Sequence, residues 1–201
     1  MSTFRFAIMG AGNIAHQFCD AVTLVEDCEV SAIASKDLGR AQKFAEECSV
    51  AHAYDNYEQM LIEEKPDCVY IAVTPNDHFR LTMLCLEHRV PVLCEKAMFT
   101  NSAEAKAVFE KAEKDQTFVM EAMWSRFLPA VNQAKKWAAE GKIGRLEALQ
   151  GRIGFLAPEG ADNRYHSPLL CGGAATDITV YAYEIATWLV NEPVRKTYAA
   201  A

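Results

Sequence analysis

The fold is decided near the amino terminus by residues 4–15, which read FRFAIM followed by GAGNIA. Residues 4–9 are apolar enough for a buried strand, and residues 10–15 fit the pattern G-x-G-x-x-G/A that joins such a strand to a helix. In this pattern Gly10 makes the tight turn, Gly12 lets a pyrophosphate approach the backbone, and Ala15 keeps the helix close to the strand. Because the helix begins near Asn13 and Ile14, its free N–H groups would face the phosphates. The stretch predicts a dinucleotide-binding turn; the alternative is a chance glycine-rich turn in an α/β protein.

Strand and helix signals continue to alternate after this stretch. The next predicted strands are residues 29–34, 51–53, 68–73, 91–94 and 118–121. The predicted helices are residues 12–24, 37–47, 76–89 and 102–115. One more helix is predicted to begin with Asp55 as its cap and to end at Pro66. Strands that alternate with helices of this length indicate βαβ units. Right-handed crossovers then produce an α/β fold with a doubly wound parallel sheet of the Rossmann type.

The regular alternation stops near Trp124. A helix over residues 129–140 ends at Gly141, and residues 145–155 resemble a long strand. Further predicted elements are a loop over 156–173, a helix over 174–190 and a strand over 194–198. We therefore expect a dinucleotide-binding domain over residues 1–123 and the start of an α+β domain over 124–201. Two strands and a helix rarely bury enough apolar surface alone, so we expect this second domain to be incomplete.

Composition excludes several classes of protein. The chain has 201 residues, 51% of them hydrophobic, and a formal net charge of −7. Nucleic-acid binders usually carry a basic excess or a basic stripe, so we expect no nucleic-acid partner. The longest strong apolar run, residues 68–73, is too short for a membrane span, and the start of the chain does not resemble a signal peptide. The seven cysteines form no Cys-x-x-Cys pair, which favours reduced thiols in the cytoplasm and gives no sign of a metal site.

The end of the second predicted strand bears on the choice of cofactor. An acidic residue about twenty positions after the glycine pattern would bind the ribose 2′-hydroxyl of NAD. Here the strand ends at Ser35 and Lys36, and Arg40 follows one helical turn later. A hydroxyl and two cations suit a 2′-phosphate, which favours NADP. The adjacent Asp37 keeps NAD open as the alternative, as does the possibility that both cations are merely solvated.

Two more segments follow predicted strands at their carboxyl ends, where open α/β sheets bind ligands. Residues 74–78 read TPNDH, with Thr74, Pro75, Asn76 and His78 as candidate cofactor contacts. Glu95 and Lys96 follow the fifth strand. A lysine there can hydrogen-bond a substrate hydroxyl; the alternative is a surface lysine that pairs with Glu95.

Together these motifs resemble the glucose–fructose oxidoreductase / inositol dehydrogenase / MocA family over the whole chain. Residues 10–15 match the family's nucleotide turn, residues 74–78 match T-P-N-x-x-H, and residues 94–97 (CEKA) are similar to its E-K-P. Residues 172–181 (GGAATDITVY) resemble G-G-x-x-x-D-x-x-x-H/Y. Residues 121–127 (EAMWSRF) are similar to the branch that holds dimeric dihydrodiol dehydrogenase and NADP-dependent xylose dehydrogenase.

The resemblance implies a role for each matched residue. Lys96 would touch the reacting hydroxyl, Asp177 would orient the substrate or the lysine, and Tyr181 would transfer the proton. Asp177 and Tyr181 are spaced i,i+4, so we expect them on one helix face. Trp124 and Arg126 would flank the cofactor. Without the family, Tyr181 is more simply a packed aromatic residue on an apolar helix.

The sequence departs from the family at two points. Ala97 replaces the family proline, which leaves the backbone after Lys96 open. Members of the family are also much longer, with a large sheet in the second domain.

The resulting expectation is an NADP-dependent oxidoreductase that acts on a hydroxyl of a sugar, polyol or cyclic diol. It would take a small-molecule substrate, use no metal, and form a homo-oligomer, a dimer, if the second domain is complete. The alternative is a non-catalytic NADP-binding sensor or a truncated remnant of such an enzyme. A different Rossmann reductase would leave Glu95, Lys96, Asp177 and Tyr181 unexplained.

Overall fold

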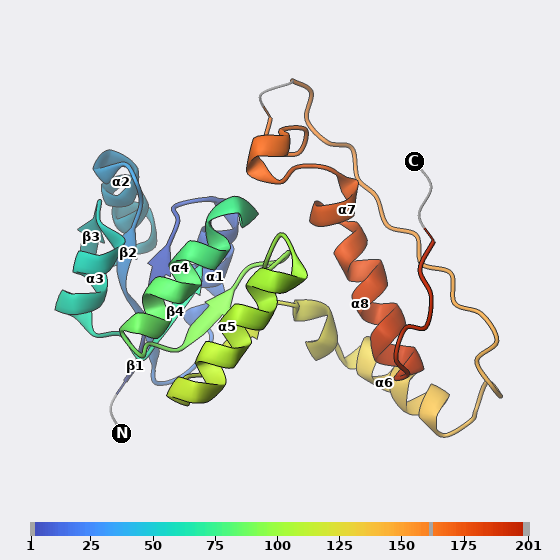
Figure 1. Cartoon of the computed structure of the whole chain (residues 1–201). Helices are drawn as coiled ribbons and strands as arrows, with labels where there is room; N and C mark the ends of the chain where they lie inside the picture. The colour runs from blue at the N-terminus through green and yellow to red at the C-terminus, as the bar shows by residue number, and fades with distance from the viewer. Residues whose placement is uncertain (1–2, 161–162, 199–201) are drawn as a thin grey trace. The chain divides into compact units, whose positions relative to one another are not determined.

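The computed structural model describes residues 3–160 and 163–198, and the chain divides into two compact units, Met1–Ala122 and Met123–Ala201 (Figure 1). Within the described ranges, no helix is long and apolar enough to cross a membrane.

The first unit is built on one six-stranded sheet. Its strands are β1 (Phe4–Met9), β2 (Cys28–Ala34), β3 (His52–Tyr54), β4 (Cys68–Ile71), β5 (Val92–Cys94) and β6 (Val119–Glu121). The strand order is β3-β2-β1-β4-β5-β6, and every neighbouring pair is parallel. The order reverses direction between β1 and β4, which makes the carboxyl ends of these two strands the switch point of the sheet. The predicted doubly wound parallel sheet is confirmed.

Five helices connect these strands. They are α1 (Asn13–Val22), α2 (Leu38–Cys48), α3 (Tyr57–Glu64), α4 (Pro75–Glu87) and α5 (Ser102–Asp115). Side chains that accept a first-turn backbone N–H cap three of them: Asp37 caps α2, Asn56 caps α3 and Asn101 caps α5. The expected cap of α3 by Asp55 is therefore wrong by one residue, because the Asn56 side chain binds the Gln59 N–H.

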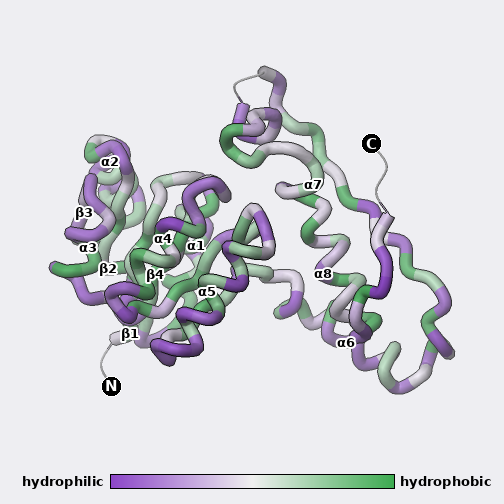
Figure 2. The backbone as a smooth tube through the Cα atoms, in the orientation of Figure 1, coloured by the Kyte–Doolittle hydropathy of each residue, from purple (hydrophilic) through white to green (hydrophobic). Residues whose placement is uncertain are grey.

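The sheet is covered on both faces, as the alternation of β1 side chains shows. Ala7 and Met9 pack into a core with residues of α3 and α4, whereas Ile8 packs with α1 and α2 on the other face. In Figure 2 the central strands are coloured hydrophobic and much of the outer helical surface is coloured hydrophilic. Such strands are buried on both sides, which explains why residues 68–73 form a continuous apolar run.

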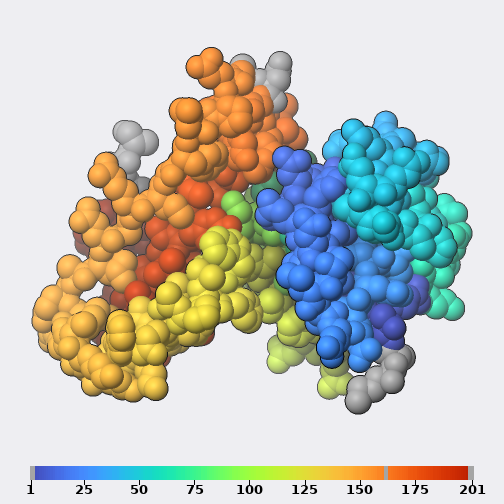
Figure 3. Space-filling model, turned by 180° about the vertical axis from the view of Figure 1, so that it is seen from behind, coloured from blue at the N-terminus to red at the C-terminus, as the bar shows by residue number. Residues whose placement is uncertain are grey.

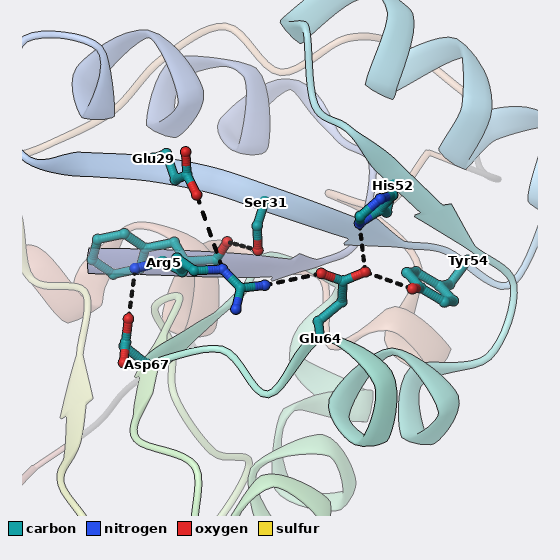
Figure 4. Close-up of polar contacts among 8 residues, drawn as sticks. Arg5, Glu29, Ser31, His52, Tyr54, Glu64 and Asp67 are labelled. Carbon is teal, nitrogen blue, oxygen red and sulfur yellow. Dashed lines mark hydrogen bonds and ion pairs between the residues drawn. The ribbon is translucent and has the colours of Figure 1, made fainter. Parts of the chain in front are cut away.

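A buried carboxylate ties the amino edge of this sheet together (Figure 4). Glu64 is only 6% exposed and accepts hydrogen bonds from Arg5 at 3.0 Å and Tyr54 at 2.6 Å. His52 Nδ1 lies 2.6 Å from the same carboxylate. Burial, and then the Glu64 carboxylate, raise the pKa of Tyr54. The network joins α3 to β1 and β3.

A cavity of about 480 Å³ opens at the same amino edge. Cys19 and Cys48 line it, together with Arg5 and Glu64 of the network. Burial raises the pKa of Cys19 to about 12, so this thiol stays protonated near neutral pH. Ligands of open parallel sheets bind at the opposite, carboxyl edge, where the candidate site lies.

The second unit is helical in its described part. It contains η1 (Trp124–Phe127), α6 (Pro129–Ala139), η2 (Pro168–Leu170), α7 (Ala174–Asp177) and α8 (Thr179–Val190). The predictions of strands over residues 145–155 and 194–198 are wrong, because no described segment of this unit pairs with either one. Instead, residues 149–153 run beside α8, where a Cβ on Gly151 would lie 3.1 Å from the Ala182 Cβ (Figures 1 and 3).

The predicted single helix over residues 174–190 is broken at Ile178, whose φ of −126° lies outside the helical region. One side chain binds a backbone carbonyl across this break, since the Thr179 hydroxyl donates to the Ala174 carbonyl at 2.9 Å. The Thr176 hydroxyl donates to the Cys171 carbonyl, which lies before α7, also at 2.9 Å. Neighbouring β-branched residues also lower helix propensity, so local chemistry ends α7 before α8 begins.

Candidate active site

Gly10 fixes the turn after β1 in two ways. Its φ of +111° is one that residues with a side chain rarely adopt. A Cβ at this position would also lie 2.6 Å from the Ala72 carbonyl oxygen at the end of β4. The turn therefore packs closely against the end of β4 at the switch point of the sheet, as the glycine pattern predicted.

The residues at the switch point fit a pyrophosphate. Helices α1 and α4 both begin there, and neither has a side chain that caps its first turn, in contrast to α2, α3 and α5. A Cβ on Gly12 would meet only the Ala72 oxygen, at 3.9 Å, and the φ of Gly12 is an ordinary −104°. The backbone conformation at position 12 does not require a glycine, and the surrounding protein leaves room for a side chain there. A ligand that approaches the backbone closely would require a glycine. Uncapped helix N-termini bind anions, and a dinucleotide cofactor carries one of suitable size.

The end of β2 brings the predicted cationic residues to the same edge. The Arg40 guanidinium donates to the Ala11 carbonyl of the glycine turn at 3.4 Å. Ser35 is buried, and its hydroxyl lies 3.5 Å from the Asp37 N–H. The Asp37 carboxylate accepts the Arg40 N–H at 2.8 Å as the cap of α2. Asp37, which follows Lys36 in the sequence, therefore caps the N-terminus of α2.

The acid that contacts Lys36 comes instead from the start of α4. Asp77 Oδ2 makes a close ion pair with Lys36 Nζ, and Oδ1 accepts from Arg80 Nε at 3.3 Å. Burial works to raise the pKa of Asp77, but the hydrogen bonds and charges of Lys36 and Arg80 outweigh it and lower the pKa. This carboxylate is ionised at neutral pH and partly neutralises the cations of the edge.

His78 is buried below the carboxyl edge of the sheet and hydrogen-bonds two backbone segments. It is 0% exposed, with Nε2 3.1 Å from the Val73 carbonyl and Nδ1 3.0 Å from the Ala97 carbonyl. Burial lowers the pKa of His78, although its backbone hydrogen bonds oppose that effect. His78 thus connects the end of β4 to the loop after Lys96, and its direct contact with a cofactor stays a prediction.

Glu95 and Lys96 follow β5 at the same edge. The Tyr70 hydroxyl donates to Glu95 Oε1 at 2.6 Å, and the Lys96 N–H donates to Oε2 at 3.2 Å. Burial raises the pKa of Glu95, and these hydrogen bonds partly offset it. The Lys96–Ala97 peptide bond is cis, and Lys96 itself is half-buried. Glu95 is thereby fixed by Tyr70 at the base of the lysine.

In the second unit, Trp124 and Tyr181 are in direct contact. The indole N–H of Trp124 donates to the Tyr181 hydroxyl at 3.0 Å, and the two rings meet edge to face at 6.0 Å. Tyr181 lies in the first turn of α8 and is half-buried. The phenol oxygen of Tyr181 thus accepts a hydrogen bond from a donor that η1 supplies.

Arg126 is engaged by a buried acid. Its Nε makes a close ion pair with Glu184, which is 7% exposed and also accepts from the Ser125 hydroxyl at 2.9 Å. The Arg126 guanidinium also lies 4.5 Å from the centre of the Trp188 ring. These contacts join η1 to α8, and the expected contact of Arg126 with the cofactor stays a prediction.

Asp177 and Tyr181 do not share a helix face, because the break at Ile178 puts them on different helices. The Asp177 carboxylate lies 3.5 Å from the Arg164 guanidinium. A Cβ on Gly172 would lie 2.4 Å from the Arg164 carbonyl oxygen, so this glycine permits the approach of the Arg164 loop to α7.

Sequence reasoning missed the partners that hold these side chains. Asp77 lies 41 positions from Lys36 and Glu184 lies 58 from Arg126, whereas Arg164 precedes Asp177 within the loop before α7. Only Asp77 could have been found, since it stands in the first turn of a helix at the predicted edge. Across the described residues, no three His, Cys, Asp or Glu side chains gather as a metal site would require.

The fold and this edge define a dinucleotide-binding α/β protein. The family described as "Oxidoreductase family, NAD-binding Rossmann fold" matches residues 4–123, and the "GFO/IDH/MocA C-terminal domain" matches residues 131–201. The chain belongs to the Gfo/Idh/MocA oxidoreductase family, which confirms the resemblance.

Named relatives place the chain near diol and sugar dehydrogenases. It is 32% identical over 190 residues to trans-1,2-dihydrobenzene-1,2-diol dehydrogenase of Mus musculus, and the match covers 92% of this chain and 56% of that protein. It is 30% identical over 190 residues to D-xylose 1-dehydrogenase (NADP(+)) 2 of Haloferax volcanii, covering 94% and 58%. The chain thus spans a little over half the length of these relatives.

Solved structures share the fold. A probable dehydrogenase from Thermotoga maritima superposes with a TM-score of 0.80 at 22% identity, covering 95% of this chain and 56% of that one. Scyllo-inositol dehydrogenase from Lactobacillus casei, solved with NAD(H) and scyllo-inositol, superposes with a TM-score of 0.76 at 14% identity, covering 94% and 57%.

Proposed function

We propose that this chain binds NADP at the carboxyl edge of its sheet and belongs to an enzyme that transfers a hydride between the nicotinamide and a hydroxyl of a sugar, polyol or cyclic diol. The observation that carries the proposal is the switch point itself. Two uncapped helices begin there beside Gly12, whose missing side chain leaves room that the protein does not fill. Membership of an oxidoreductase family supports the same conclusion.

NADP is favoured over NAD by charge. Lys36 and Arg40 follow β2, and the acid next to them in the sequence, Asp37, is committed to the cap of α2. Arg40 is already directed at the glycine turn through the Ala11 carbonyl. A 2′-phosphate needs such cations, whereas a ribose hydroxyl pairs better with an acid. The NADP(+) in the name of the Haloferax relative agrees with this choice.

The roles proposed for the reacting groups are those that the family resemblance implies. The bound nicotinamide supplies the hydride acceptor or donor. Lys96 hydrogen-bonds the substrate hydroxyl, Asp177 orients the substrate or the lysine, and Tyr181 takes the hydroxyl proton. A phenol normally has a pKa near 10, so it needs help to act as a base near neutral pH. The Trp124 N–H donated to the Tyr181 oxygen is one such source of help.

Two further properties belong to the same proposal. The seven cysteines are all free thiols, which supports a reducing, cytoplasmic setting. Large apolar side chains such as Leu156 and Leu169 are exposed in the second unit, which supports a homo-oligomer.

The test is a titration followed by a screen. NADP and NAD are first titrated against the protein by fluorescence at fixed salt. Sugars, inositols and dihydrodiols are then tested with each cofactor while the nicotinamide absorbance is followed. Binding with turnover supports the dehydrogenase, binding without turnover of any substrate supports the non-catalytic NADP-binding alternative, and absence of binding to either nucleotide rejects both.

A further inference from the structure

We propose that Asp77 determines how strongly this protein prefers NADP over NAD, by neutralising the Lys36 ammonium at the site of the 2′-phosphate. The inference rests on the proposed binding of NADP and adds a residue that limits it. Asp77 is then a specificity-determining residue that acts through Lys36.

The geometry places Asp77 between two cations. One carboxylate oxygen holds Lys36 Nζ and the other accepts from Arg80 Nε at 3.3 Å. The Asp77 side chain is 16% exposed, whereas that of Lys36 is 68% exposed. The lysine is therefore the mobile partner, and the carboxylate is the fixed one that decides where the ammonium lies.

Arg80 is fixed from its other side. Its guanidinium carbon lies 5.9 Å from the centre of the Tyr57 ring, at the start of α3. Asp77 itself stands in the first turn of α4, where the helix dipole favours an anion. The Asp77 carboxylate is thus carried by the first turn of α4, with Arg80 between it and the Tyr57 ring of α3.

Charge then decides the sign of the effect. Lys36, Asp77 and Arg80 together carry a net charge of +1, because two cations share one anion. Without the Asp77 charge, Lys36 and Arg80 would present two uncompensated cations to a phosphate dianion. NAD lacks this phosphate, and any gain at the pyrophosphate is common to both nucleotides and does not change their ratio of affinities. Asp77 therefore weakens NADP binding selectively and keeps the preference for NADP modest.

The experiment compares NADP and NAD affinities of the parent protein, Asp77→Asn and Asp77→Ser at low salt. Both replacements remove the charge and suit the first turn of a helix. The matched control is Asp115→Asn, which removes the same charge from an ion pair with Lys111 on α5. We expect about 3- to 10-fold tighter NADP binding in both Asp77 variants, a change of less than about 2-fold for NAD, and no change in the control.

A second comparison tests the route through Lys36. In a Lys36→Met background, Asp77→Asn should change NADP affinity by less than about 2-fold, since the ammonium it would release is gone. The gain should also disappear in about 1 M salt, where charges are screened within about 3 Å.

Several outcomes would overturn the inference. Unchanged or weaker NADP binding in both Asp77 variants would do so, as would an equal gain for NAD or a full gain in the Lys36→Met background. These results leave NADP binding by the parent intact, so they differ from failure of the proposed function, in which the parent itself binds neither nucleotide and both ideas fall.

Discussion

The indole N–H of Trp124 donates a 3.0 Å hydrogen bond to the hydroxyl oxygen of Tyr181. The two residues are 57 positions apart, one in η1 and the other in the first turn of α8. Tyr181 can keep its own proton available for transfer while its oxygen accepts from the indole. Trp124 is therefore suited to hold the phenol in one orientation and to stabilise the charge that appears when the proton leaves.

Replacement of Trp124 should alter how the reaction depends on pH. Trp124→Phe keeps an aromatic ring but removes the donor, and a hydrogen bond to a charged group contributes about 1.5–3 kcal/mol. We expect the rate of hydroxyl oxidation to fall about 10-fold near neutral pH and its pH profile to move to higher pH. The control is Trp137→Phe on the exposed surface of α6, which should behave like the parent. An unmoved pH profile in Trp124→Phe would rule out this role.

The cationic end of β2 should control cofactor choice. We expect the parent to bind NADP more tightly than NAD, and Lys36→Ala and Arg40→Ala to lose most of that difference while NAD affinity changes little. Fluorescence titrations at fixed salt measure both affinities. Lys43→Ala, an exposed residue of α2 that pairs with Glu47, is the control. Equal affinities in the parent, or an unchanged preference in both variants, would contradict the assignment of NADP.

The sequence allowed much of the first unit to be predicted because its signals are local. The glycine pattern, the apolar runs and the helix ends each act within a few residues, and Gly10 has the positive φ that its place in the pattern requires. Contacts between distant residues were not predictable in the same way. Nothing near Lys36 in the sequence identifies Asp77 as its partner, and the adjacent Asp37 caps α2 instead.

The second unit shows where periodicity misleads. Residues 145–155 resemble a strand in sequence, but a strand also needs a neighbour that pairs with it, and within the described part of this unit none does. The spacing of Asp177 and Tyr181 suggested one helix face because a helix was assumed to be continuous. The Thr179 hydroxyl binds the Ala174 carbonyl across that point, a side-chain hydrogen bond that periodicity does not detect.

The Glu64 network should matter for stability. Glu64→Gln leaves Arg5 and His52 beside a neutral, buried amide, and their side chains, 36% and 58% exposed, stay hydrated. Because the amide keeps part of the hydrogen bonding, we expect a loss of about 1–3 kcal/mol in urea unfolding. Glu110→Gln, which removes an exposed acid that pairs with Lys106 on α5, should change stability by about 0.5 kcal/mol or less. Equal stability of the two variants would contradict a structural role for the network.

His78 should make stability depend on pH. Its pKa is lower in the folded protein than the usual 6.5 because it is buried, so the unfolded chain takes up a proton first as pH falls. Stability should therefore decrease below about pH 6.5, by at most about 1.4 kcal/mol per pH unit from this residue. His78→Gln should be less stable at neutral pH and lose less on acidification than the parent. Parallel curves of unfolding free energy against pH would show that His78 contributes nothing to the dependence.

Lys96 and Tyr181 should carry the chemistry, whereas Gly10 and Gly12 should serve only the cofactor. Lys96→Met and Tyr181→Phe remove the groups that handle the proton and nearly keep their volumes. General acid–base groups contribute about 10²- to 10⁴-fold in rate, so each variant should lose turnover in that range while NADP affinity stays near that of the parent. The two losses should be less than additive in free energy if the groups act as a unit. Asp177→Asn should lose less, since it keeps the shape and a hydrogen bond but not the charge. Parent-like turnover in Tyr181→Phe would mean that another group moves the proton. If the variants lose turnover and still bind NADP normally, a purely non-catalytic role for this site is excluded.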